Sequence, residues 1–172
     1  MTLEPERKKL ILRRGSLALI LLVLAVLQNT DGFFPQIFGV RALLLIPAVV
    51  CIAMFERDMA GMFFGLFAGA LWDINAGGAS FNALYLMAVG FICGTLINTI
   101  MRNNIVTALI LSMVFIPVYI VGYWFFHYIV GGIDMAGFVF LRYYLPCIFY
   151  SAVFLPVMFI GVRAIEKHYS EE

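Results

Sequence analysis

Apolar residues run along the chain in long blocks, with only short polar or charged breaks between them. Three stretches, residues 74–101, 103–133 and 143–162, contain no aspartate, glutamate, lysine or arginine. Each is long enough for an α-helix that crosses the hydrocarbon core of a membrane, which takes roughly 20 residues. Blocks of this length indicate transmembrane helices, because half-buried strands would show alternating apolar and polar residues. The pattern predicts an all-α polytopic membrane protein.

The breaks divide the chain into six predicted spans in a single bundle, with a basic N-terminal segment at 1–14 and a polar, exposed tail at 164–172. A basic start before an apolar run is also typical of a secretory signal. Residues 26–28 offer no small-residue cleavage site, however, which favours an uncleaved first span. The predicted spans cover residues 15–30, 40–55, 56–74, 81–101, 105–130 and 138–162.

The second and third spans are both short for a membrane, and only the charged residues 56–58 separate them. They form either a tight transmembrane hairpin or a re-entrant pair that never fully crosses. The other breaks leave no room for a soluble domain on either face.

Charged residues make up 12% of the chain, against about 25% in a soluble domain, and their distribution predicts the orientation. With six spans and a cytoplasmic N-terminus, Arg41 and Arg142 are the only basic residues outside. The other nine of the eleven lie inside, as the positive-inside rule requires. Both termini are therefore predicted to be cytoplasmic. The inner set is Arg7, Lys8, Lys9, Arg13, Arg14, Arg57, Arg102, Arg163 and Lys167.

Two successive predicted helices carry glycines at four-residue spacing, Gly61, Gly65 and Gly69 on the first and Gly90 and Gly94 on the second. This spacing places each set on one face of its helix. Within lipid, where apolar burial between helices gives no driving force, such small residues let two backbones approach closely. We expect the two helices to form the packing centre of the bundle.

Asp73 continues the first glycine stripe by one more turn, at the outer end of the third span. A carboxylate at membrane depth is costly, which suggests an ion or substrate ligand or one half of an ion pair. Arg41 and Arg142, the only outer cations, are the candidate partners. Alternatively, Asp73 lies at the interface and is solvated there. Its place on the stripe favours an inward-facing structural role.

Other candidate residues do not form a chemical site. His127 lies in an aromatic cluster typical of a membrane interface, and His168 is predicted on the opposite face, so a metal site is not expected. The three cysteines, at 51, 93 and 147, lie within spans as small buried side chains do. No protease, nucleotide-binding or dinucleotide-binding motif is present. We expect no enzymatic activity, no cofactor and no nucleic-acid partner.

The glycine-rich stretch resembles the rod shape-determining MreD family. The resemblance rests on a G-x-x-x-G-x-x-x-G-x-x-x-D-I pattern, a later glycine pair and an apolar helix with two further glycines: Gly61, Gly65, Gly69, Asp73 and Ile74, then Gly77 and Gly78, then Gly90 and Gly94. This specific part covers about residues 56–94. Over the rest of its 172 residues the chain is similar to the family only in layout, with a short basic start and five or six spans.

The resemblance implies a scaffold in the bacterial inner membrane. Members of the family act with MreC and, through it, with the MreB filament, RodA and its partner transpeptidase, to place new peptidoglycan along the lateral wall. The family is also similar in fold to the substrate-binding subunits of energy-coupling-factor vitamin transporters, which hold a ligand near the outer face. A vitamin-binding subunit is therefore the alternative function, with Asp73 and Arg142 lining the pocket or its vestige.

Overall fold

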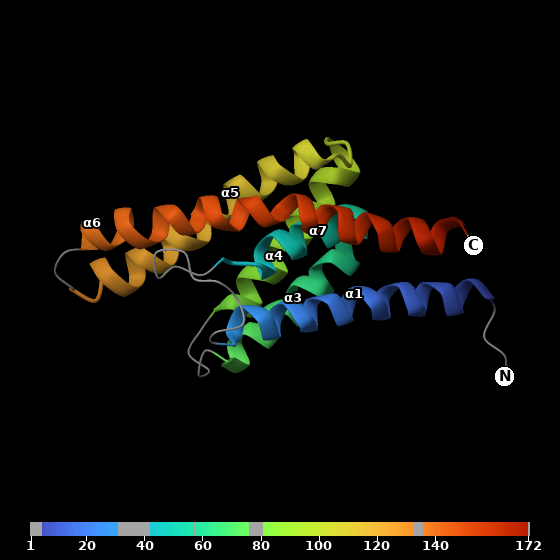
Figure 1. The fold of residues 1–172 in the computed structure, drawn as a ribbon, viewed down its shortest axis with the longest axis horizontal. Coiled ribbons are helices and arrows are strands. Elements are labelled where there is room, and N and C mark those ends of the chain that lie inside the picture. Colours follow the sequence, from blue (N-terminus) through green and yellow to red (C-terminus); the bar gives the residue numbers. More distant parts are fainter. Residues whose placement is uncertain (1–4, 31–41, 57, 76–80, 133–135, 172) are drawn as a thin grey trace.

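The structure is a computed structural model that describes residues 5–30, 42–56, 58–75, 81–132 and 136–171 (Figure 1). These residues form helices and no strand, which confirms the all-α prediction. There are six continuous helical segments, because the π-helical turns η1 and η2 extend the helices beside them. The segments are α1 (Pro5–Asn29), α2 (Leu45–Phe55), α3 (Asp58–Asn75), α4 (Asn82–Thr99), α5 with η1 (Ile105–Trp124, Phe125–Ile129), and α6, η2 and α7 (Ala136–Val139, Phe140–Tyr144, Leu145–Glu171).

Four helices of the described chain are long and apolar enough to cross a membrane: Glu6–Asn29, Asn82–Thr99, Ile105–His127 and Gly137–Tyr169. The chain thus has the character of a multi-pass membrane protein. The second predicted span is a helix of 11 residues, so it is roughly 16 Å long and cannot cross a core of about 30 Å by itself. The third, α3, has 18 residues, but Asp58, Asp73 and its glycines make it less apolar. Six complete crossings remain a prediction.

The short helix α2 lies at the centre of the molecule. All residues from Leu45 to Met54 are buried, and α2 contacts α1, α3, α4, α5 and α7. Pro47 falls in its first turn, where a proline removes no intrahelical hydrogen bond. Because every face of α2 is covered by another helix, the core of the bundle forms around it.

The backbone amides of residues 43–45, where the chain enters α2, are bonded to side chains from two other helices. Gln28 of α1 accepts hydrogen bonds through its Oε1 from the amides of Leu44 and Leu45, at 2.7 and 3.0 Å. Ser151 of α7 accepts one from the amide of Leu43 at 2.8 Å. A helix start buried without such partners would be strongly unfavourable. These bonds allow α2 to begin inside the protein.

In Figure 1, α1 and α7 lie side by side along the long direction of the molecule, and α3 and α4 lie across them. The start of α1 and the end of α7 are at the same end. Helix α1 begins within the predicted basic segment, at Pro5, and α7 continues to Glu171. The tail predicted to be exposed is therefore helical, and part of it packs, because the hydroxyls of Ser16 and Tyr169 are hydrogen bonded at 3.3 Å.

Candidate functional site: the α3–α4 seam and the charged end

The glycines of α3 lie directly against the backbone of α4. A Cβ atom built on Gly65 would be 2.1 Å from the carbonyl oxygen of Leu86, and one on Gly69 would be 2.3 Å from the Cα of Ala83. Real Cβ atoms do not approach backbone so closely. Any side chain at these two positions would therefore push the helices apart.

Gly90 of α4 meets Gly61 of α3 in the same way. A Cβ on Gly90 would be 2.2 Å from the Gly61 carbonyl oxygen, and a Cβ on Gly61 would be 2.8 Å from the Gly90 carbonyl oxygen and 2.9 Å from Cβ of Ala53 in α2. We call Gly61, Gly65, Gly69 and Gly90 the α3–α4 seam. Gly94, the fifth glycine of the sequence pattern, is buried one turn further along α4. The seam brings α3 against α4 along its length and against α2 at one end.

Asp73 closes the seam at its other end. Its Oδ1 accepts a hydrogen bond from the amide of Asn82 at 3.2 Å, and its Oδ2 accepts one from the amide of Ala83 at 2.9 Å. These amides belong to the first turn of α4, where a helix leaves its N–H groups without intrahelical partners and its dipole favours a negative charge. Gly69, one turn earlier, contacts the backbone of the same two residues. The four-residue repeat thus ends in a carboxylate that caps the neighbouring helix.

An aromatic group joins the capped end of α4 to α5. The hydroxyl of Tyr119 donates a 2.7 Å hydrogen bond to Oδ1 of Asn82, which is 5% exposed. The Tyr119 ring lies 5.2 Å from both Trp72 and Tyr85, between ring centroids. The Tyr85 hydroxyl in turn donates a 2.6 Å bond to the carbonyl of Phe115. The polar groups around Asp73 therefore bind one another across α3, α4 and α5.

The structure does not pair Asp73 with Arg142, one of the two suggested partners. Within the described part of the chain, Asp73 and Arg142 form no ion pair; Arg142 lies exposed in η2. Arg41 lies outside the described residues, as do Arg57 and the glycine pair at 77 and 78.

A second polar cluster lies at the opposite end of α3, where α1, α2 and α7 meet. The Glu56 side chain, 2% exposed, receives Arg13 at 2.7 Å on Oε1 and Arg14 at 3.3 Å on Oε2. Arg13 also pairs with Glu166 of α7 at 3.2 Å. We call Arg13, Arg14, Glu56 and Glu166 the charged end.

The two arginines of the charged end stabilise a carboxylate that the fold buries. Glu56 follows the last turn of α2, where the helix dipole disfavours a carboxylate, and it is almost fully buried. Two guanidinium groups offset both the burial and the dipole. Nearby, the amide of Asn98 donates to Asp58, and that of Asn103 donates to the carbonyl of Met54 at 3.0 Å. Helices α1, α3, α4 and α7 thus make polar contacts at this end of the bundle, where α2 ends and α5 begins.

Sequence reasoning did not identify this cluster. From the sequence, Arg13 and Arg14 indicate only the orientation of the chain, and Glu56 indicates only the break between two spans. One signal was present, because an acid between two apolar helices needs a partner. Which arginine supplies it depends on helix neighbours that local patterns do not reveal.

The acidic side chains of both regions are engaged in structural contacts. The Asp73 carboxylate is used as a helix cap, and Glu56 is held between arginines. Among the residues that the structure describes, no three histidine, cysteine or acidic side chains are placed to hold a metal ion. His127 stacks on Tyr123 with 5.5 Å between ring centroids, and the three cysteines are buried and unbridged. Comparison with models of known protein families, with curated proteins and with solved structures found no match.

Proposed function

We propose that this chain is a non-enzymatic scaffold of the MreD type in the bacterial inner membrane. In this role it binds MreC and, through MreC, helps to position MreB, RodA and the partner transpeptidase during lateral peptidoglycan synthesis. Its six spans include α2 and α3, although α2 alone is too short to cross the hydrocarbon core, and both termini lie in the cytoplasm.

The observation that carries the proposal is the use made of Asp73. This is the residue that a transporter subunit would offer to a ligand, and both its oxygens accept backbone hydrogen bonds from α4. The G-x-x-x-G-x-x-x-G-x-x-x-D pattern that resembles the MreD family therefore acts as one packing device. A rigid bundle with its polar groups turned inward suits a protein whose work is to hold partners.

The placement of the charged end supports the proposed orientation. Arg13 near the start of α1 pairs with Glu166 near the end of α7, so these two ends of the chain lie on the same side. An even number of crossings requires this arrangement. Of the nine basic residues predicted to be cytoplasmic, Arg13 and Arg14 hold the two acids of this end, Glu56 and Glu166.

The outer faces of the bundle bind the partner. Helices α1, α5 and α7 expose rows of large apolar side chains, among them Leu19 (62%), Val118 (55%) and Val153 (68%). Such faces pack against lipid or against the single transmembrane helix of a partner. We propose that MreC docks on one of them.

Co-purification from a rod-shaped bacterium tests this function. The tagged, detergent-solubilised chain is analysed by mass spectrometry for proteins and for small molecules. We expect MreC and wall synthases, without a stoichiometric vitamin. An energising pair of ATPases together with a bound vitamin would overturn the proposal in favour of the transporter subunit.

Two variants make the test specific to the bundle. Gly65→Leu forces α3 and α4 apart, so we expect partner recovery and rod shape to be lost with it. Gly122→Leu is the matched control, because a Cβ at Gly122 meets nothing within 4 Å. Normal partner recovery and rod shape in Gly65→Leu would refute the role of the seam.

A further inference from the structure

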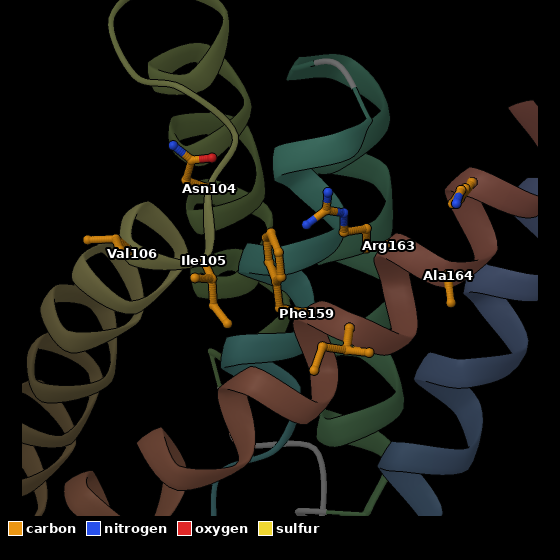
Figure 2. A pocket seen from close by; sticks show the side chains of 8 residues that line it. Asn104, Ile105, Val106, Phe159, Arg163 and Ala164 are labelled. Atoms are coloured by element: carbon orange, nitrogen blue, oxygen red, sulfur yellow. The ribbon is translucent and has the colours of Figure 1, made fainter.

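A groove of about 580 Å³ lies between the start of α5 and the last turns of α7. In Figure 2, Asn104, Ile105 and Val106 line one side, and Arg163 reaches from α7 toward that side, near Phe159. We call it the α5–α7 groove. It is lined by Asn104, Ile105, Val106, Phe159, Ile160, Arg163, Ala164 and Lys167.

The rim of the groove is cationic. Arg163 and Lys167 are four residues apart on α7, so they lie on one face, and none of the lining residues is acidic. Arg163 is exposed and forms no ion pair with any described residue. Glu166, the acid close to it on α7, is directed to Arg13 of α1. The positive end of the α5 dipole, which lies at the groove, adds to the field. An anion is the complementary ligand.

The rest of the groove is apolar and continues along the bundle. Phe159, 3% exposed, lies beneath Arg163, whereas Val106 and Ile160 are 64% and 62% exposed. From these two residues, rows of exposed side chains continue at helical spacing on the same faces of α5 and α7. The rows are Val106, Ile110, Val114 and Val118 on α5, and Ile160, Val157 and Val153 on α7.

We propose that the α5–α7 groove binds one anionic phospholipid. Its phosphate lies at Arg163 and Lys167, and its acyl chains lie along the two apolar rows. A small anion would leave the rows unused, and an apolar helix would leave Arg163 without a counter-charge. Basic sites between membrane helices on the cytoplasmic side suit anionic head groups. The inference does not depend on the scaffold function.

Native mass spectrometry of the full chain in detergent tests the site. The probes are dioleoylphosphatidylglycerol, dioleoylphosphatidylcholine and glycerol 3-phosphate. We expect the anionic lipid to bind preferentially, with about fivefold weaker binding in Arg163→Gln or Lys167→Gln and roughly twentyfold in the double variant. Arg163→Lys, which keeps the charge, should bind within about twofold of the original chain. Thermal unfolding establishes that each variant is folded.

Arg102→Gln is the matched control, because Arg102 is an exposed arginine just before α5 that does not line the groove. It should leave lipid binding unchanged. An equal loss in this control would show that general charge, and not the groove, attracts the lipid. Equal binding of the two lipids, or of glycerol 3-phosphate and the anionic lipid, would also overturn the proposal.

Discussion

The α3–α4 seam and the charged end hold different helices of the bundle together by opposite means. In the seam, side chains are missing, and the carbonyl oxygens of one helix lie where a Cβ of the other would be. At the charged end, long side chains bridge helices that are far apart in sequence: Glu56 lies 43 positions after Arg13, and Glu166 lies 153 positions after it. An added side-chain atom destabilises the seam, whereas the loss of a charge destabilises the charged end.

The two regions therefore respond differently to solution conditions. Backbone packing in the seam involves no net charge, so salt leaves it unaffected. The arginines of the charged end are 28% and 46% exposed, which lets dissolved ions screen their attraction to Glu56. This contrast makes the two contributions separable by experiment.

The largest expected effect is in the seam. Gly65→Ala places a Cβ 2.1 Å from the Leu86 oxygen, where only backbone movement gives relief. We expect a loss of about 3 kcal/mol in the free energy of unfolding, measured by dodecyl sulfate titration in mild detergent. Gly161→Ala, whose Cβ would meet nothing within 4 Å, is the control and should be neutral or slightly stabilising. Equal stability of the two variants would remove the distinction between the seam and an ordinary glycine.

A smaller effect is expected at the charged end. Glu56→Gln leaves Arg13 and Arg14 without their shared carboxylate and should cost about 2 kcal/mol, since both arginines retain access to water. Added salt should destabilise the original chain and Gly65→Ala alike, but Glu56→Gln much less. Glu6→Gln, an exposed acid in the first turn of α1, is the control. Undiminished salt sensitivity in Glu56→Gln would contradict the role given to Glu56.

Gly61 provides a graded test within the seam. Its Cβ would be 2.8 Å from the Gly90 oxygen, a less severe contact than at Gly65, and 2.9 Å from Cβ of Ala53. Gly61→Ala should therefore cost about 1 kcal/mol in the same titration. A loss as large as that of Gly65→Ala would mean that distance to the facing backbone does not set the cost.

An effect as small as that of Gly61→Ala is expected where the seam closes. Asp73→Ala removes both acceptors from the α4 amides and should cost about 1 kcal/mol. Asp73→Asn keeps one acceptor oxygen and should lose about half as much. If both variants instead kept full stability but lost a bound small molecule, Asp73 would be a ligand and not a cap.

The all-α class could be predicted because long charge-free blocks are a local property of the sequence. The glycines at 61, 65, 69 and 90 lie in a helix contact because an absent side chain acts wherever a second backbone is near. The contacts of Asp73 were harder to predict. The sequence suggested Arg41 or Arg142 as its partner, whereas the structure supplies two backbone amides of α4. Pro47 lies in the first turn of α2, where a proline is compatible with a helix start.

The pairings of Glu56 and Gln28 could not be predicted. Each depends on which helices are neighbours in space, and neither residue stands in a periodic pattern. The length of α2 was overestimated for a similar reason. Apolar residues continue on its N-terminal side, and the helix begins where Gln28 and Ser151 can cap it.

The capped start of α2 also constrains the order in which the protein is built. The amide of Leu43 bonds to Ser151, which is 108 residues further along the chain and leaves the ribosome long after it. Until α7 is inserted, one face of α2 is uncovered and the amide of Leu43, just before the helix, lacks the Ser151 hydroxyl. A nascent chain that stops before α7 is thus an unfinished core, exposed to membrane chaperones and proteases. The core around α2 is therefore completed only when α7 has been inserted.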